Sequence, residues 1–331
     1  MVITKTPYRI SFFGGGTDYP AWSRENGGAV LSTSINKYCY ISARFLPAFF
    51  EHRHRFVYSL IESVREIDEI KHPAIKGVLN WMNWNAGIEV HHDGDLPARS
   101  GLGSSSAFTV GFINSLLALQ NRRASKNELA KNAIHVEQNV INEAVGSQDQ
   151  VAVAFGGFNT ISFLKNDDFI VKPMILSPKR LALFQSSLML FYTGESRIAS
   201  SVAQSKINNI KNRRKELEAI YYSVERAISI LNSEKDLMDF GYLLDEMWQI
   251  KKMLSEKVSN SLIDDIYIKA KRSGALGGKV LGAGGGGFML FFVPQERQLN
   301  VKESLKDFLN VPFKFEYEGS SVTLYQPSDL D

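Results

Sequence analysis

Cysteine, net charge and long apolar runs are scarce in this 331-residue chain, and each scarcity narrows what the protein can do. Cys39 is the single cysteine, so no intramolecular disulfide can form, which is typical of a reducing compartment. The net charge of +3 is small for this length and does not favour nucleic acid or a membrane surface as a partner. The longest apolar run, Phe288–Val293, is much too short to span a bilayer.

The N-terminus lacks the basic stretch, apolar core and small-residue cleavage site of a secretory signal, so we expect a cytoplasmic protein. The length suggests two domains or one domain with two lobes. Long, charged amphipathic helix patterns begin only after about residue 175. We therefore expect an N-terminal domain over 1–175 and a C-terminal domain over 176–331. Strand and helix patterns mix without a regular βαβ rhythm, which predicts an α+β fold.

The stretch Asp95–Ala107 is rich in small residues and predicts a turn that opens onto a helix. Gly101 and Gly103 let the backbone approach a ligand closely or adopt positive φ, and Ser104–Ser106 occupy N-cap and first-turn positions. The free N–H groups at the positive end of the helix dipole suit a phosphate chain, and a serine hydroxyl there can reach Mg²⁺. Taken alone, the stretch also fits a turn that merely caps a helix.

Two further glycine runs, Gly14–Gly16 and Gly282–Gly287, suggest that several backbones approach one ligand. The last run contains a GxGxxG match, which hints at a dinucleotide-binding fold. That fingerprint needs a helix after it, whereas a strand pattern follows here. We therefore expect a glycine loop between two strands, near the substrate.

Two acids flank the end of a second predicted helix, with Glu137 on it and Asp149 just past it. A carboxylate near a serine hydroxyl and phosphate oxygens is what Mg²⁺ requires, and a second near an acceptor hydroxyl would take or orient its proton. Each acid also has an ordinary alternative, an exposed helix residue for Glu137 and a turn residue for Asp149. Arg9 lies inside an apolar strand and Asp18 follows the triple glycine. Taken singly, Arg9 also fits an outward-facing strand residue and Asp18 a turn residue or helix cap.

Three motifs, read in order, resemble those of the GHMP small-molecule kinases, the family of galactokinase, homoserine kinase, mevalonate kinase and phosphomevalonate kinase. They are Pro7–Asp18, Pro97–Ala107 and Leu281–Phe288, and they span nearly the whole chain. Three stretches resemble one branch of this family, the branch that includes heptose 7-phosphate kinases and the kinase part of fucokinases. They are the triple glycine before Asp18, Val145–Gln150 and Tyr192–Arg197.

The resemblance implies a two-lobed fold, an α/β sandwich lobe followed by a ferredoxin-like lobe, with the active site between them. It implies that ATP phosphates lie on Gly101, Leu102, Gly103, Ser104, Ser105 and Ser106, and that Ser105 with Glu137 ligates Mg²⁺. It also implies that Asp149 is the base or orienting acid, with Arg9 beside it to keep it ionised and to neutralise the moving phosphoryl group. Substrate contacts would come from Gly16, Thr17, Asp18, Gly284, Gly285 and Gly286. Many relatives have alanine at the position of Ser106, which leaves open which of Ser104, Ser105 and Ser106 holds the metal.

These roles lead us to expect an ATP-dependent kinase that phosphorylates the anomeric hydroxyl of D-glycero-D-manno-heptose 7-phosphate, giving the 1,7-bisphosphate used to build activated heptose for capsule or lipopolysaccharide. A phosphate-bearing substrate needs a cationic contact, for which Arg197 is the candidate, although it also fits an exposed helix N-terminus. The alternatives are an L-fucose or other hexose 1-kinase and a catalytically silent sugar sensor. We expect a small-molecule sugar phosphate as partner and a monomer or homodimer.

Overall fold

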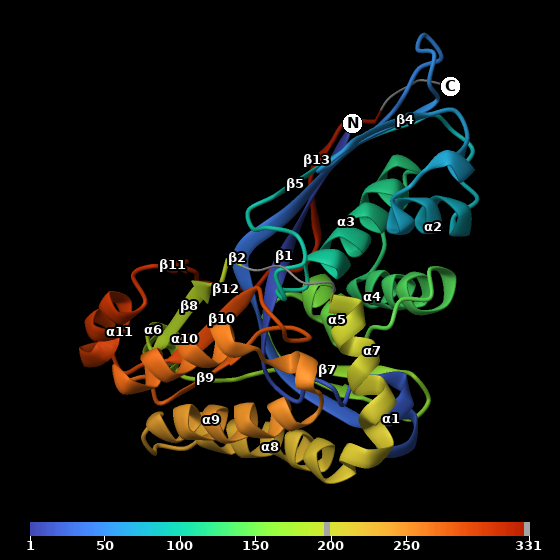
Figure 1. Ribbon diagram of the computed structural model, residues 1–331. Helices are drawn as coiled ribbons and strands as arrows, with labels where there is room; N and C mark the ends of the chain where they lie inside the picture. Colours follow the sequence, from blue (N-terminus) through green and yellow to red (C-terminus); the bar gives the residue numbers. More distant parts are fainter. Residues whose placement is uncertain (195–198, 328–331) are drawn as a thin grey trace.

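Two β-sheets organise the molecule in the computed structural model, which describes residues 1–194 and 199–327 (Figure 1). The larger sheet has nine strands, in the order β13-β1-β2-β5-β3-β4, with β12 and β6 pairing with β2 and with β7 beside β6. All pairs are antiparallel except β3 with β5. Its strands are β1 (Val2–Phe13), β2 (Gly28–Phe45), β3 (His54–Val57), β4 (Ile61–Val64), β5 (Ile88–Gly94), β6 (Phe158–Phe163), β7 (Phe169–Pro173), β12 (Phe315–Glu316) and β13 (Ser321–Tyr325).

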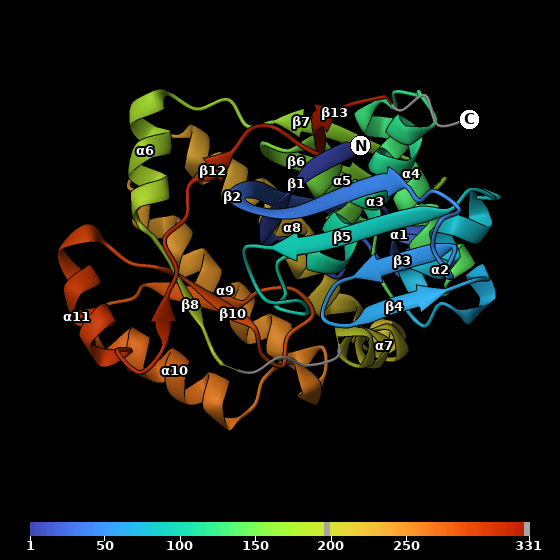
Figure 2. The ribbon, with the colours of Figure 1, turned by 90° about the horizontal axis from the view of Figure 1, so that it is seen from above.

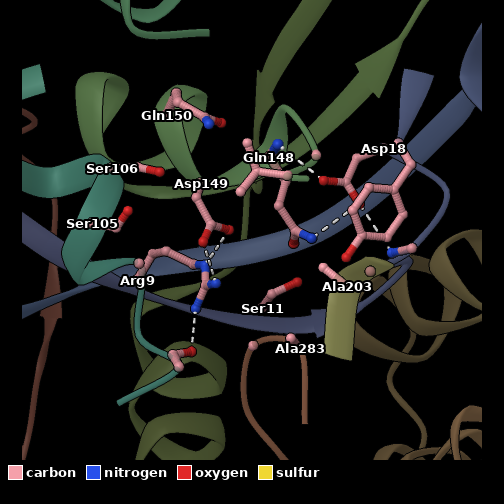
Figure 3. A pocket seen from close by; sticks show the side chains of 18 of the residues that line it. Arg9, Ser11, Asp18, Ser105, Ser106, Gln148, Asp149, Gln150, Ala203 and Ala283 are labelled. Carbon is pink, nitrogen blue, oxygen red and sulfur yellow. Dashed lines mark hydrogen bonds and ion pairs between the residues drawn. The ribbon is translucent and has the colours of Figure 1, made fainter. Parts of the chain in front are cut away.

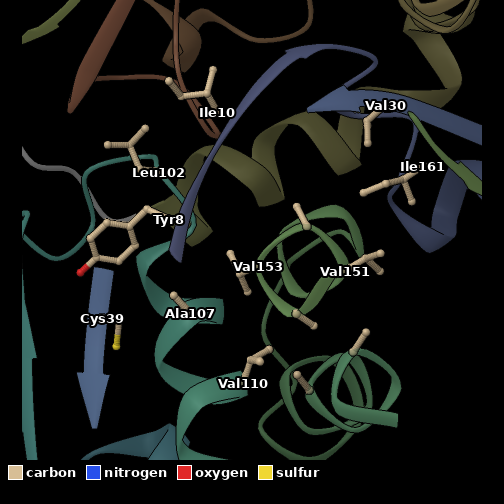
Figure 4. Close-up of a cluster of buried hydrophobic side chains, with 14 of the residues drawn as sticks. Tyr8, Ile10, Val30, Cys39, Leu102, Ala107, Val110, Val151, Val153 and Ile161 are labelled. Carbon is tan, nitrogen blue, oxygen red and sulfur yellow. The ribbon is translucent and has the colours of Figure 1, made fainter. Parts of the chain in front are cut away.

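Helices α2–α5 cover one face of this sheet (Figures 1 and 2). Helix α3 lies against β1 and β2 and is enclosed by α2, α4 and α5 on its other sides, which explains why its sequence is apolar all round. The side chains of Ala107 and Val110 meet Val153 of α5 in this layer (Figure 4). The helices are α1 (Pro20–Asn26), α2 (Pro73–Trp81), α3 (Ser104–Leu119), α4 (Lys126–His135) and α5 (Gln148–Phe155), with a 3₁₀ turn at Ile67–Glu69 and a π-helical turn at Val136–Val140.

The second sheet is antiparallel and has the strand order β11-β8-β10-β9. Helices α9 and α10 pack against it, whereas α8 packs against α9 and the first sheet. Its strands are β8 (Leu188–Tyr192), β9 (Gly277–Val280), β10 (Phe288–Phe292) and β11 (Leu309–Asn310). The helices are α6 (Pro178–Ser186), α7 (Ala199–Asn209), α8 (Arg214–Asn232), α9 (Met238–Met253), α10 (Ser261–Arg272) and α11 (Gln298–Ser304), with 3₁₀ turns at Ile210–Arg213, Glu256–Val258 and Gln295–Arg297. The mixed α+β architecture predicted from the sequence is therefore confirmed.

The last two strands return to the first sheet, where β12 pairs with β2 and β13 pairs with β1. The division into 1–175 and 176–331 stays a prediction. The amphipathic sequence that follows residue 198 suggests one long helix, but in the structure α7 ends at Asn209 and α8 begins at Arg214. The Asn209 side chain donates to the carbonyl of Leu254, 3.1 Å away, a tertiary contact that helical periodicity does not reveal. Over the part of the chain that is described, no helix has both the length and the apolar character needed to cross a membrane.

Strand β1 is irregular where it approaches the glycine loops. Its register against β2 shifts between Pro7 and Tyr8 and again between Ser11 and Phe13. Such shifts bend a strand and redirect its side chains. The segment between the two shifts carries Arg9 and Ser11, and both residues line the pocket described next.

Candidate active site

A pocket of about 240 Å³ lies where β1, the N-termini of α3 and α5, and the loop after β9 meet (Figure 3). Segments far apart in the sequence supply its walls, as expected if several glycine-rich backbones converge on one ligand. The predicted site residues that line it are Arg9, Gly16, Asp18, Gly101, Gly103, Ser104, Ser105, Ser106 and Asp149.

The loop before α3 is fastened to β1 through Arg9. The backbone N–H of Arg9 donates to the Leu102 carbonyl at 2.9 Å, and its guanidinium donates to the Gly101 carbonyl at 2.7 Å. Gly103 stands at the N-cap of α3 with φ 77°, a left-handed conformation that suits glycine. The first N–H groups of an α-helix have no partner within the helix, so the α3 N-terminus forms a cradle for an anion. Leu102 contributes only backbone, since its side chain is buried in the core (Figure 4).

The second and third glycine loops are in direct backbone contact. A Cβ added to Gly101 would lie 2.5 Å from the Leu281 carbonyl oxygen, and one added to Gly287 would lie 2.2 Å from the Ser100 carbonyl oxygen. No side chain fits in either place. Of the third run, Gly282 and Ala283 line the pocket. The structure does not bring Gly284, Gly285 or Gly286 to it, because this part of the loop turns towards Val258, whose carbonyl accepts the Gly285 N–H at 2.9 Å.

Arg9 and Asp149 form a two-pronged ion pair in the pocket (Figure 3). The Arg9 Nε lies 2.8 Å from Asp149 Oδ1, and a terminal guanidinium nitrogen lies 2.6 Å from Oδ2. The Arg9 side chain is 3% exposed, whereas that of Asp149 is 27% exposed, so the carboxylate is the partner that a ligand can reach. Asp149 lies past the end of the preceding helix, as predicted, and also occupies the first turn of a new helix, α5. Each carboxylate oxygen retains acceptor capacity beyond the arginine bonds.

Asp18 is almost fully buried in another wall of the pocket, where three N–H groups hold its carboxylate. They belong to the Gly16 backbone at 2.9 Å, the Gln148 backbone at 3.2 Å and the Gln148 side chain at 3.0 Å. Burial raises the pKa of Asp18, the nearby Asp149 raises it further, and these backbone hydrogen bonds lower it. Gly146 packs on the same carboxylate so closely that an added Cβ would lie 1.8 Å from Asp18 Oδ2.

The predicted substrate residue Thr17 is not brought to the pocket. The Thr17 hydroxyl donates to the Gly14 carbonyl at 2.8 Å and accepts the Ala29 N–H at 3.1 Å. Thr17 is fully buried and closes the turn of the first glycine run rather than facing a ligand. Arg197 lies outside the described residues.

Glu137 lies behind the N-terminus of α3, on the π-helical turn that follows α4. The Ser106 hydroxyl donates to Glu137 Oε2 at 3.1 Å and the Gln150 amide donates to the same oxygen, while Oε1 is buried without a partner. Burial, with Glu143 nearby, raises the pKa of Glu137 to about 8, and hydrogen bonds from Thr109, Gln150 and Ser106 oppose the rise.

The oxygen donors near the α3 N-terminus are of the kind that Mg²⁺ takes, although Glu137 itself does not line the pocket. No group of three or more histidine, cysteine, aspartate or glutamate side chains within the described ranges is arranged to hold a metal ion. Magnesium in phosphoryl-transfer sites, however, commonly takes only one or two carboxylates, with substrate phosphates and waters as the other ligands. The free Oε1 of Glu137 and the Ser105 hydroxyl at the pocket wall are oxygen donors of this kind.

Several residues that line the pocket are not among the predicted site residues, and those that bear most on its chemistry are Gly146, Gln148, Lys206, Lys251 and Lys279. One signal was available for Lys251. It falls on the stripe of α9 formed by Leu244, Met247 and Trp248, where helical spacing predicts a buried apolar residue. Lys279 likewise interrupts the short buried strand β9. A cation at a core position is a candidate functional residue, because lysine is almost never fully buried without a partner.

Comparison with known proteins gives consistent results. The chain matches the models of the GHMP kinases N terminal domain over residues 63–157 and of the GHMP kinases C terminal region over residues 214–311. The D-glycero-alpha-D-manno-heptose 7-phosphate kinase of Campylobacter jejuni is 30% identical over 314 residues, 92% of each chain. The bifunctional fucokinase/GDP-fucose pyrophosphorylase of Arabidopsis thaliana is 23% identical over 91% of this chain and 31% of its own length. The crystal structure of a D-glycero-D-manno-heptose 1-phosphate kinase from Bacteriodes thetaiotaomicron superposes with a TM-score of 0.80 at 26% identity, covering 98% of this chain and all of the other.

Proposed function

The chain belongs to the GHMP kinase family and is an ATP-dependent phosphotransferase that acts on a sugar hydroxyl, and from this premise we propose that its acceptor is the anomeric hydroxyl of D-glycero-D-manno-heptose 7-phosphate. The product would be the 1,7-bisphosphate. The similarity to the Campylobacter jejuni enzyme over 92% of both chains supports this acceptor. We also propose that the product serves the synthesis of a nucleotide-activated heptose for a surface polysaccharide.

The nucleotide phosphates would lie on the backbone of Gly101–Ser106. The N–H groups at the start of α3 supply donors there, and the contact between the glycine loops holds them in place. Ser105 and Glu137 would hold Mg²⁺, which neutralises phosphate charge when bound. Ser106 and Gln150 would orient Glu137 through Oε2 and leave Oε1 for the ion.

The Arg9–Asp149 ion pair is the observation on which we base the position of the acceptor hydroxyl. Asp149 is partly exposed to the pocket and would orient the acceptor hydroxyl and take its proton. Arg9 fixes both oxygens of Asp149 and the loop before α3, so the carboxylate and the phosphate cradle keep one relative position. Catalysis would be mainly positioning and charge neutralisation.

The test is a panel of acceptors with purified protein and MgATP. The panel contains D-glycero-D-manno-heptose 7-phosphate, the 1-phosphate of the same sugar, the free heptose, L-fucose and galactose. We expect the 7-phosphate to give the highest kcat/KM and a product whose anomeric proton couples to phosphorus in the NMR spectrum. Faster turnover of L-fucose would favour the function of the Arabidopsis relative's kinase part. Turnover of the 1-phosphate would place the transfer at a different hydroxyl and refute the proposal.

A further inference from the structure

Three lysines from three different elements line the same pocket and are nearly inaccessible to solvent. Lys206 on α7 and Lys251 on α9 are each 7% exposed, and Lys279 on β9 is 8% exposed. None of the three forms an ion pair with a carboxylate of the described chain. Burying an ammonium group is costly unless charge or hydrogen bonds compensate, so this arrangement needs an explanation.

Backbone carbonyls hold two of the three ammonium groups in position. Lys251 Nζ donates to the carbonyls of Val280 at 2.9 Å and Gly282 at 2.8 Å. Lys279 Nζ donates to the carbonyls of Ser11 at 3.0 Å and Phe12 at 2.7 Å. An ammonium group has three donors, so one donor remains on each.

Lys206 has a different environment. Its ammonium group lies over the ring of Tyr19, 5.4 Å from the centroid, and forms no hydrogen bond with any described residue. Its donors are therefore available to a ligand in the pocket.

The charges around the lysines do not balance. Burial lowers the pKa of Lys251 well below its usual value, and repulsion from Lys279, Lys206 and Arg9 lowers it further. Burial also lowers the pKa of Lys206 to about 8, against the opposing effect of Asp18 and Asp149. Both acids already accept hydrogen bonds from other groups. Burial, with Arg9 and Lys206 nearby, lowers the pKa of Lys279 to about 7. The charged groups nearest the lysines are Arg9, Asp18 and Asp149, and Arg99 and Glu143 also line the pocket. A bound anion would favour the charged form of each amine and offset the repulsion among these cations.

The positions of Lys206 and Lys279 favour the acceptor end of the pocket for this anion, whereas Lys251 is held at the third glycine loop. Lys279 is bonded to β1 just before the triple glycine, and Lys206 packs on Tyr19, just after Asp18. These are the walls assigned to the acceptor, whereas the nucleotide phosphates have their own cradle of N–H groups at α3. We propose that Lys206, Lys251 and Lys279 together bind the phosphate group that the acceptor sugar already carries, so that they select a sugar phosphate over the free sugar. This inference rests on the proposed function, and it gives to the lysine cluster the role predicted for Arg197.

The experiment compares two acceptors, D-glycero-D-manno-heptose 7-phosphate and the unphosphorylated heptose, in wild type and three variants. Lys206→Met, Lys251→Met and Lys279→Met each keep the length of the side chain and remove its charge. We expect each to lower kcat/KM for the 7-phosphate about 10- to 100-fold, mainly through KM, because a charge-assisted hydrogen bond is lost. The kcat/KM for the free heptose and the KM for ATP should change less than about threefold.

Lys252→Met is the matched control. Lys252 neighbours Lys251 on α9 but points away to Asp264, 3.4 Å from its Oδ1, and does not line the pocket. This variant should preserve the preference for the phosphorylated acceptor. Lys206→Met is the variant least at risk of misfolding, since no backbone carbonyl loses a donor. An equal loss with both acceptors, or a raised KM for ATP with an unchanged acceptor preference, would overturn the inference.

A second measurement separates this inference from the proposed function. With a non-hydrolysable ATP analogue and Mg²⁺ bound, mannose 6-phosphate and mannose are titrated into wild type and Lys206→Met by calorimetry. If wild type phosphorylates neither heptose, the proposed acceptor is wrong. The lysine cluster is still supported if Lys206→Met weakens binding of mannose 6-phosphate about tenfold and leaves that of mannose unchanged. Absence of any such difference, or of any binding of the sugar phosphate, refutes it.

Discussion

Gly146→Ala should impair the use of the acceptor sugar, which we assign to the Asp18 and Asp149 side of the pocket. It should leave the binding of ATP at the α3 N-terminus unchanged. Gly146 does not have positive φ, so alanine is compatible with its backbone. The three atoms nearest to an added Cβ all belong to the Asp18 carboxylate, the closest at 1.8 Å. Non-bonded carbon and oxygen atoms require more than 3 Å, roughly. Asp18 must therefore move by about 1 Å or more.

The expected loss of stability and activity follows from the hydrogen bonds that the Asp18 carboxylate accepts. Its displacement breaks hydrogen bonds from the Gly16 N–H and from the backbone and side chain of Gln148. A buried donor left unpaired costs about 1–3 kcal/mol, so we expect a loss of about 3 kcal/mol in the free energy of unfolding after partial relaxation. A misplacement of about 1 Å in a positioning group can cost about 100-fold, which is the expected fall in kcat/KM for the acceptor.

A double-mutant cycle with Asp18→Ala tests this reasoning. Removing the carboxylate makes room for the new methyl group, so Gly146→Ala should cost less than about 0.5 kcal/mol in that background. Urea unfolding measures stability, and steady-state assays measure KM for acceptor and ATP. A full cost of Gly146→Ala in both backgrounds would show that the clash with Asp18 is not its cause. A large rise in the KM for ATP would contradict the assignment of the two ends.

The other predictions concern the reacting pair, the metal, the glycine contact and pH. Asp149→Asn should lose at least about 100-fold in kcat and retain MgATP binding by calorimetry, and near-full turnover would remove Asp149 from the mechanism. Ser105→Ala should raise the Mg²⁺ concentration for half-maximal activity about tenfold, and more than Ser106→Ala does, because the Ser106 hydroxyl already serves Glu137. Gly287→Ala should raise the KM for ATP and destabilise the fold, because its Cβ would lie 2.2 Å from the Ser100 carbonyl oxygen; unchanged thermal unfolding would disprove this. The pKa values of Lys279 and Lys206 are about 7 and about 8 in the free protein, and a bound anion favours the charged amines, so the KM for the phosphorylated acceptor should rise with pH above about 7, and Lys206→Met should reduce the part of the rise above 8.

Patterns in the sequence predicted the nucleotide end of the pocket well. The Gly101–Ser106 turn and the helix behind it were expected from local chemistry, and the structure has both. The contact between Arg9 and Asp149 was implied only by family resemblance, because the two residues lie 140 positions apart and neither is unusual in its own segment. The family and the α+β fold are confirmed, and the individual site roles stay predictions.

The acceptor end was much harder to predict, for physical reasons. Lys206, Lys251 and Lys279 become a cluster only through tertiary packing, and no local pattern links a helix, another helix and a strand. Gly146 follows a helical pattern as an ordinary helix-ending glycine would, whereas in the structure it makes room for Asp18. The Gly284–Gly286 segment was expected to face the substrate, because a glycine run shows that backbones come close but not which side faces the ligand.

The backbone contact between the second and third glycine loops also bears on how the family diversifies. A side chain at Gly101 or Gly287 would collide with the backbone of the opposite loop. Because the obstacle is backbone, no substitution in the opposite loop can remove it. Evolution therefore has little freedom to retune recognition of the shared phosphate donor. In the lysine-bearing wall from α7, α9 and β9, Lys206 donates to no backbone carbonyl, unlike Lys251 and Lys279, so new substrate preferences should arise most readily by change at Lys206.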